Sequence, residues 1–169
     1  LLKGEWQLNN FSSALHAMLT LDCEFTDTEL KRALSNWQIP GRLQVIMKQP
    51  LVLSDVAHNQ QSVENLAKWL ADNPVKGQTR TVFSVLADKN MADWISAMDA
   101  VVDHWFIFEL KNQRAMPINE LKITMADHVS LISVFDTGSQ AYEMALKVSD
   151  PADRIIVFGS FHVLDEVFS

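Results

Sequence analysis

The sequence is poor in the residues and runs that mark several classes of protein. Its 169 residues include one cysteine, Cys23, which excludes an internal disulfide and favours a reducing compartment. Only five glycines and five prolines occur, and no segment reads as a disordered or low-complexity linker. No apolar run approaches the roughly 18 residues of a membrane span, and the N-terminus lacks a signal-peptide core. We therefore expect a cytoplasmic protein without a membrane partner.

Clustered positive charge is also missing. The formal net charge is −7, and no run of basic residues is longer than the pair Lys31 and Arg32. This charge argues against a broad nucleic-acid or anionic-membrane footprint, so any anion that the chain binds must be held locally. Because the first residue is Leu rather than Met, we expect a processed product or a piece of a longer polypeptide.

The composition that remains is globular, with 48% hydrophobic and 21% charged residues, enough to bury a core. Two helices are predicted before Pro40. Apolar residues recur at helical spacing in residues 11–19. In the second helix Thr26 is the expected N-cap, and Glu29 closes a capping box.

After Pro40, apolar runs alternate with helical patterns. Alternation of this kind is typical of an α/β fold: a Rossmann-like, mostly parallel sheet with helices on both faces. The expected strands lie in LQVIMK, LVLSDV, RTVFSVLA, HWFIFEL, VSLISVF and RIIVFG, and helices are expected from about Gln60 to Ala71, from about Met91, Ile118 and Ser139, and after Gly159.

Polar residues follow three of the expected strands. Ligands of open α/β sheets sit outside the carboxyl ends of the strands, where N–H groups of the next helices point outward. We therefore expect three polar turns to line one crevice. These turns carry Asp55, His58 and Asn59 after the second strand, Asp88 and Lys89 after the third, and Gly159 and Ser160 after the sixth.

Simpler roles stay open for these residues. Asn59 and Ser160 are good N-caps whatever the function, Asp55 is a possible turn acid, and His58 is a possible structural histidine. The first helix after Asn59 is expected to bury Val63 and three further apolar residues on one stripe.

Two catalytic alternatives are weaker. Asp55, His58, His162 and Asp165 suggest a metal site, but their spacing matches no compact zinc pattern, and we expect no metal ligands here. A serine triad on Ser160 lacks its nucleophile elbow, because His162 stands where the second glycine of G-x-S-x-G would be.

Four strings carry a family resemblance. They are PGRLQVI at 40–46, DVAHN at 55–59, LADKN at 86–90 and FGSFH at 158–162. In this order and spacing the chain resembles the C-terminal part of bacterial dihydrofolate synthase/folylpolyglutamate synthases, members of the Mur ligase superfamily. The resemblance covers essentially the whole chain, and P-G-R followed by D-x-A-H-N is its most specific part.

The resemblance implies two parts. Residues 1–39 look like the helical end of the family's central ATPase domain, and residues 40–169 look like the C-terminal glutamate-ligase domain. GEWQLNNF is similar to the family's G-E-H-Q-x-x-N-A helix, although Trp6 replaces His and Phe11 replaces Ala. Asn10 matches the family Asn that contacts adenine.

The resemblance also implies a reaction. Such ligases use ATP to phosphorylate a carboxylate, and the amine of glutamate then attacks the acyl phosphate to form an amide. By position, Arg42 would contact the ATP phosphates, for which its planar charged fork is suited, and Asp55 the ribose. His58 and Ser160 would bind and orient glutamate as the catalytic, substrate-binding pair.

One element of such a ligase is missing. No glycine is followed by Lys, so the chain has no P-loop. The family carries that loop, its magnesium ligands and most of its pterin site upstream. We therefore expect ATP and Mg²⁺ as cofactors, glutamate and dihydropteroate or folate as substrates, an upstream ATPase domain in cis, and no turnover by this chain alone.

Two other readings stay open. A non-catalytic binding module of the same fold is favoured by the missing P-loop and by Trp6, Phe11 and Asn90, which depart from the family pattern. Another Mur-type ligase, acting on cell-wall precursors, is the second. Asp88 and Lys89 match the family's D-K-D turn except at Asn90, and we assign them no role.

Overall fold

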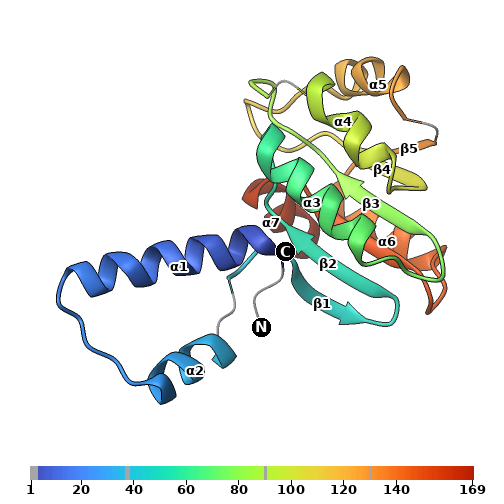
Figure 1. The fold of residues 1–169 in the computed structure, drawn as a ribbon. Coiled ribbons are helices and arrows are strands. Elements are labelled where there is room, and N and C mark those ends of the chain that lie inside the picture. Colours follow the sequence, from blue (N-terminus) through green and yellow to red (C-terminus); the bar gives the residue numbers. More distant parts are fainter. Residues whose placement is uncertain (1–3, 37–38, 90, 130) are drawn as a thin grey trace. The chain divides into compact units, whose positions relative to one another are not determined.

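The computed structural model divides into two compact units, Leu1–Pro40 and Gly41–Ser169 (Figure 1). The first unit holds helices α1, Glu5–Thr20, and α2, Asp27–Asn36. The structure describes residues 4–36, 39–89, 91–129 and 131–169.

The helix α2 starts at the predicted capping box. The Thr26 N–H donates to the Glu29 carboxylate at 2.8 Å, and the Glu29 N–H donates to Thr26 Oγ1 at 3.3 Å. Each side chain thereby satisfies a backbone donor that the first helical turn leaves without a partner. The predicted start of this helix is confirmed.

The second unit is built on a six-stranded sheet of order β1-β2-β6-β3-β4-β5. The edge strand β1 pairs antiparallel with β2, and the other four pairings between these strands are parallel. The mostly parallel sheet is therefore confirmed. The strands are β1 Gln44–Lys48, β2 Leu51–Asp55, β3 Thr79–Phe83, β4 His104–Phe108, β5 Ile132–Phe135 and β6 Arg154–Phe158, and the helices are α3 Gln60–Asp72, α4 Ala92–Asp99, α5 Ile118–Ala126, α6 Gly138–Lys147 and α7 Phe161–Phe168.

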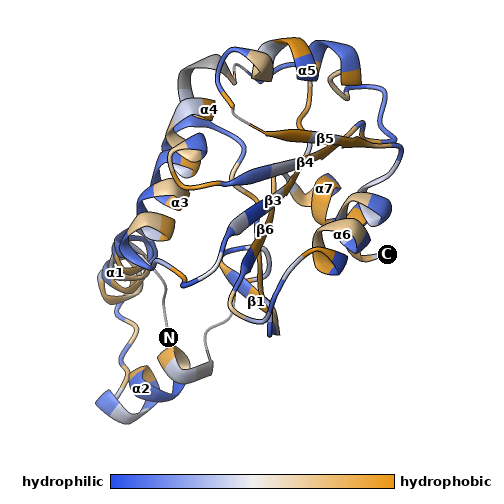
Figure 2. Cartoon of the chain, turned by 90° about the vertical axis from the view of Figure 1, so that its right-hand side faces the viewer, coloured by the Kyte–Doolittle hydropathy of each residue, from blue (hydrophilic) through white to orange (hydrophobic). Residues whose placement is uncertain are grey.

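Helices cover both faces of this sheet, as the alternating pattern predicts. Figure 2 shows α3 and α4 on one side of the central strands, and α6 and α7 on the other. Strands β3 and β6 are buried along their whole length, which explains why β6 reads as a nearly continuous apolar run rather than as an alternating one.

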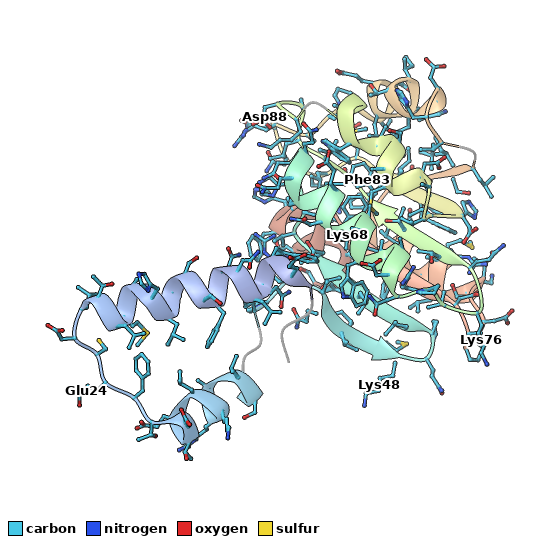
Figure 3. All side chains as sticks on the ribbon, viewed as in Figure 1. Glu24, Lys48, Lys68, Lys76, Phe83 and Asp88 are labelled. Carbon is cyan, nitrogen blue, oxygen red and sulfur yellow. The ribbon has the colours of Figure 1, made fainter. Side chains whose placement is uncertain are left out.

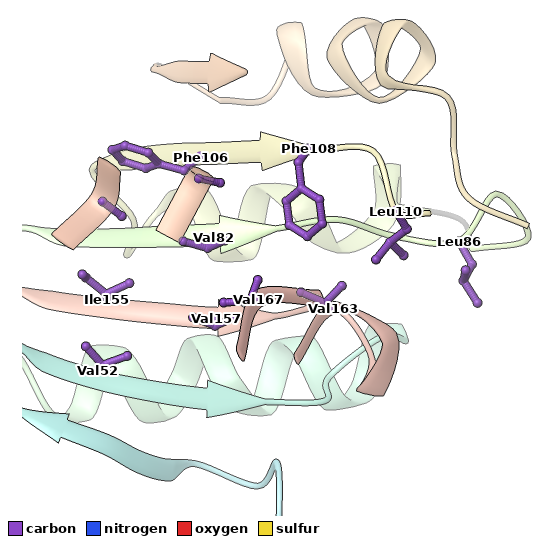
Figure 4. Close-up of a cluster of buried hydrophobic side chains, with 12 residues drawn as sticks. Val52, Val82, Leu86, Phe106, Phe108, Leu110, Ile155, Val157, Val163 and Val167 are labelled. Carbon is purple, nitrogen blue, oxygen red and sulfur yellow. The ribbon is translucent and has the colours of Figure 1, made fainter. Parts of the chain in front are cut away.

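The core on the α6 and α7 side joins the middle strands to the last helix. Val82, Phe106 and Ile155 point from three strands into one cluster (Figure 4). Val163 and Val167, one helical turn apart on α7, pack into the same cluster. Because α7 follows β6 directly, this packing fixes how the chain leaves the end of β6.

The opposite face is held by aromatic rings. Phe83, the last residue of β3 and labelled in Figure 3, is fully buried. Its ring contacts Trp94 of α4 edge-on at 5.9 Å and Phe158, the last residue of β6, at 4.7 Å between centroids. The edge-on Phe83–Trp94 pair adds to the stabilisation from burial, so the carboxyl end of β3 is packed against α4, and Phe158 of β6 packs on the same Phe83 ring.

The sheet register brings three strand ends together. Asp55 of β2 pairs with Phe158 of β6, and Phe83 of β3 pairs with Phe158 from the other side. The chain leaves β2 and β3 toward α3 and α4, but leaves β6 toward α7 on the opposite face (Figure 2). Neighbouring strands whose connections diverge in this way form the switch point at which α/β proteins bind ligands.

Candidate functional site

Asp55 ends β2 with both carboxylate oxygens engaged. Oδ2 accepts the Leu43 N–H at 2.9 Å, and Oδ1 accepts the Ala57 N–H at 2.8 Å. The residue is only 3% exposed. Its carboxylate therefore ties the end of β2 to the segment before β1 and to the turn that leads into α3.

Burial also changes the acidity of this carboxyl group. Removal from water raises the pKa of Asp55 from its ordinary 3.8 to about 6. The N–H bonds from Leu43 and Ala57 and the charge of Arg42 act in the opposite direction but do not cancel the burial effect. Asp55 therefore titrates closer to neutrality than a surface carboxyl group.

Arg42 lies in a turn with unusual backbone geometry. Gly41 has φ 64° and Leu43 has φ 46°, so a left-handed residue stands on each side of the arginine. Glycine adopts this conformation freely, whereas leucine does so rarely. The Val56 N–H donates to the Gly41 carbonyl at 2.8 Å. The backbone of the turn is thus attached to the end of β2 on both sides of Arg42.

His58 is oriented by its own turn. Its Nδ1 lies 2.8 Å from the Val56 carbonyl oxygen. A carbonyl oxygen can only accept, so Nδ1 carries the proton and Nε2 is the acceptor of the neutral ring. The half-buried ring of His58 therefore presents a defined acceptor nitrogen at the carboxyl end of the sheet.

The helix α3 begins with a reciprocal cap. The Asn59 side-chain oxygen accepts the Ser62 N–H at 3.0 Å, and Ser62 Oγ accepts the Asn59 N–H at 3.2 Å. The Asn59 cap is confirmed, and so is the buried stripe that includes Val63. The sequence analysis missed Ser62, although a hydroxyl three residues after an Asn cap is a capping-box signal.

Ser160 opens α7 beside the end of β6. Its Oγ accepts the Val163 N–H at 3.4 Å, which confirms its role as an N-cap. Gly159 before it has φ 134°, and a Cβ there would collide with the Ser84 carbonyl oxygen. Only glycine lets the chain turn this closely past the end of β3, and the half-buried Ser160 hydroxyl is thereby placed at a helix N-terminus.

The third polar turn forms an exposed ion-pair cluster. Asp88 accepts a hydrogen bond from the Arg114 guanidinium at 2.8 Å and lies 3.4 Å from Lys89 Nζ. The Ala87 N–H donates to the Arg114 carbonyl at 2.8 Å, which joins the β3–α4 and β4–α5 connections. The sequence analysis missed Arg114, because no local motif marks it. Asn90 lies outside the described residues.

The structure therefore brings Arg42, Asp55, His58 and Ser160 to one edge of the sheet, at the ends of two paired strands. Asn10 lies exposed on α1 in the first unit, and its contact with adenine stays a prediction.

The described part of the chain holds no group of three or more His, Cys, Asp or Glu side chains placed to bind a metal ion. Among the same residues, no helix combines the length and the apolar character needed to cross a bilayer.

Comparisons with known proteins identify the family of the chain. A family model described as Mur ligase, glutamate ligase domain, matches residues 41–161. The dihydrofolate synthase/folylpolyglutamate synthase of Buchnera aphidicola subsp. Schizaphis graminum is 30% identical over 162 residues, 96% of this chain and 38% of that protein. The protein of the same name from Escherichia coli (strain K12) is 28% identical over 158 residues, 94% of this chain and 36% of that protein.

Solved structures share the fold. The structure of E. coli FolC in complex with DHPP and ADP has a TM-score of 0.88 at 27% identity, covering 99% of this chain and 39% of that chain. A bifunctional folylpolyglutamate synthase/dihydrofolate synthase with Mn, AMPPNP and L-glutamate bound has a TM-score of 0.86 at 30% identity, covering 95% and 38%. The resemblance drawn from the sequence strings is confirmed, and this chain spans well under half of each of these relatives. Because the family model matches more than half of its length, the chain belongs to the Mur ligase family, as a glutamate ligase domain.

Proposed function

We propose that this chain is the C-terminal portion of an ATP-dependent ligase that joins L-glutamate to dihydropteroate, to folylpolyglutamates or to both, in the cytoplasm. The gathering of Arg42, Asp55, His58 and Ser160 at one edge of the sheet carries the proposal. The names of the relatives support the substrates, and the ligands of a solved relative, AMPPNP, Mn and L-glutamate, support the cofactors.

The nucleotide side of the site rests on Arg42 and Asp55. The Arg42 guanidinium stays protonated and offers a planar set of donors that matches phosphate oxygens. Charge that develops on a transferred phosphoryl group is stabilised by such preorganised donors. Asp55 would accept from the ribose through lone pairs that its two backbone N–H bonds leave over, and Asn10 would contact adenine.

The glutamate side rests on His58 and Ser160. The N-termini of α3 and α7 favour negative charge, which suits the carboxylates of an incoming glutamate. The Ser160 hydroxyl can donate to one carboxylate. His58 Nε2, the acceptor of the ring, can accept a proton or a hydrogen bond from the amine. Holding the amine toward the acyl phosphate lowers the barrier by orientation.

ATP supplies the phosphoryl group that activates the carboxylate, and the residues present fit only part of its binding. Arg42 suits the phosphates, but the chain has no P-loop, and its described residues contain no metal-binding cluster. Mg²⁺ and the remaining phosphate contacts would then come from an upstream ATPase domain in cis. We therefore expect no ATP turnover by the 169-residue chain alone.

The test uses the same gene extended upstream to its natural start. ADP release should require both glutamate and an acceptor, either dihydropteroate or a reduced folate, and the 169-residue chain should release none. The acceptor that supports turnover identifies which glutamate additions the protein performs. If the extended chain has no P-loop domain, the non-catalytic binding module replaces this proposal; turnover only with a cell-wall precursor would identify another Mur-type ligase.

A further inference from the structure

We propose that Asp55 is a positioning residue that holds the turn carrying Arg42, so that the guanidinium meets the nucleotide phosphates in a fixed place. This inference rests on the proposed function, because it assigns Asp55 a task in that site beyond contact with the ribose. The atoms that support it all lie in the second unit, at the carboxyl end of β2.

The Arg42 turn is bound on both sides. The Gly41 carbonyl accepts the Val56 N–H at 2.8 Å, and the Leu43 N–H donates to Asp55 Oδ2 at 2.9 Å. The α-carbon of Arg42 therefore lies between two hydrogen bonds to consecutive residues of one strand end. Removing the Asp55 acceptor would release the Leu43 side of the turn. A small rotation of the backbone at the Arg42 α-carbon then displaces the guanidinium at the end of its long side chain by a larger distance.

The backbone conformation of Leu43 depends on its hydrogen bond to Asp55. It adopts φ 46°, which is unfavourable for a residue with a Cβ. Its side chain is 1% exposed, so packing holds the side chain while the hydrogen bond to Asp55 holds the backbone N–H. Without the acceptor, the N–H would lose this charge-assisted bond in a buried place, which favours a different turn.

The burial of Asp55 favours action through the turn. The side chain is 3% exposed, and its second oxygen accepts the Ala57 N–H at 2.8 Å. A nucleotide reaches at most the lone pairs that remain, whereas the turn uses the full strength of a charge-assisted bond. The positive charge of Arg42 also acts on this carboxylate, so the pair is coupled across the turn.

A double-mutant cycle in the upstream-extended ligase separates the two tasks. We would measure kcat/KM for ATP in the wild type, Asp55→Ala, Arg42→Ala and the double variant. Asp55→Ala should lower this value by roughly tenfold or more, the loss expected when a buried donor loses its acceptor. In the Arg42→Ala background the same change should cost less than about twofold, because the residue through which Asp55 acts is already gone.

The KM for glutamate in Asp55→Ala should change less than kcat/KM for ATP, because the His58 turn loses the Ala57 bond but keeps the Nδ1 contact with the Val56 carbonyl and the Asn59 cap. Losses that multiply in the double variant would overturn the proposal and favour direct contact between Asp55 and the nucleotide. Asp103→Asn is the matched control. The Asp103 carboxylate also accepts a backbone N–H, that of Thr79 at 2.7 Å, but it lies at the amino ends of β3 and β4, away from the site.

Amide hydrogen exchange on the 169-residue chain tests the anchor without any activity. In Asp55→Ala the Leu43 amide should exchange at least about tenfold faster, while Val157 in the central strand keeps its protection. If Asp55→Ala does not fold, Asp55→Asn replaces it, and the Leu43 and Ala57 amides are followed together, because one Asn carbonyl can serve only one of them. Unchanged exchange at both would overturn the proposal even if the ligase is active; missing ligase activity with faster exchange at Leu43 would refute the proposed function alone.

Discussion

The stability of this chain should decrease with rising pH because of one buried group, Asp55. Its carboxyl group titrates at a pKa of about 6 in the folded chain, against an ordinary value of 3.8. The folded state therefore holds a proton that the unfolded state has already lost between these two values. The contribution of neutral Asp55 to stability is fully present below about 3.8 and is lost as the pH rises through about 6.

The size of this effect follows from the two pKa values. A separation of about 2 pKa units corresponds to about 3 kcal/mol in the free energy of unfolding, at 1.36 kcal/mol per unit. Asp55→Asn removes the titration at this position and keeps the shape of the side chain. The free energy of unfolding of the wild type, minus that of Asp55→Asn, should therefore fall by about 2 kcal/mol between pH 4 and 7, because part of the full change lies below pH 4.

Urea unfolding at several values between pH 4 and 7 measures this difference. Asp153→Asn is the matched control, because Asp153 lies directly before β6, at the amino end of that strand. Burial acts to raise the pKa of Asp153, but bonds from the Asp150 and Gln78 N–H groups and the Arg80 guanidinium hold that pKa below 3.8. Its contribution has the opposite sign: it is present above 3.8 and is lost as the pH falls through the lower, folded-state value. A wild type minus Asp55→Asn difference that stays flat or rises with pH would refute the reasoning.

Three further predictions concern the turns of the site. Gly159→Ala should lower the free energy of unfolding by several kcal/mol, because its Cβ would meet the Ser84 carbonyl oxygen at φ 134°; an unchanged urea midpoint would be contrary evidence. Asn59→Ala should cost about 1 kcal/mol through loss of the α3 cap, measured by the same unfolding, and no change would mean that Ser62 or water replaces the cap. His58→Ala in the upstream-extended ligase should raise the KM for glutamate by roughly tenfold or more while the KM for ATP changes little; wild-type glutamate kinetics would remove His58 from the site.

The elements of the fold could be predicted from short-range patterns. The predicted helix start at Gln60 and its buried stripe are confirmed, because helix periodicity and the Asn59 cap are local properties. The helix expected near Ser139 begins at Gly138, where Thr137 is the cap and its Oγ1 accepts the Gln140 N–H at 3.2 Å. A cap residue just before the pattern was the signal for this earlier start.

The strand order could not be predicted in the same way. The sequence shows that β6 is a buried strand but not that it lies between β2 and β3, because this placement depends on packing between segments far apart in the chain, such as Leu51 and Thr79 beside Arg154. The same limit applies to the site. No local pattern reveals that Leu43 is left-handed or that its N–H donates to Asp55, so the sequence alone identified the acid but not its backbone partners.

We propose that this chain serves a ligase that forms an amide to glutamate. The most direct measurement is mass spectrometry of the product formed by the upstream-extended chain from ATP, L-glutamate and dihydropteroate or a reduced folate, with ADP counted in the same sample. We expect an acceptor enlarged by glutamyl units, with one ADP released for each amide formed. ADP release without a glutamyl product, or no reaction from a chain that contains a P-loop domain, would contradict it.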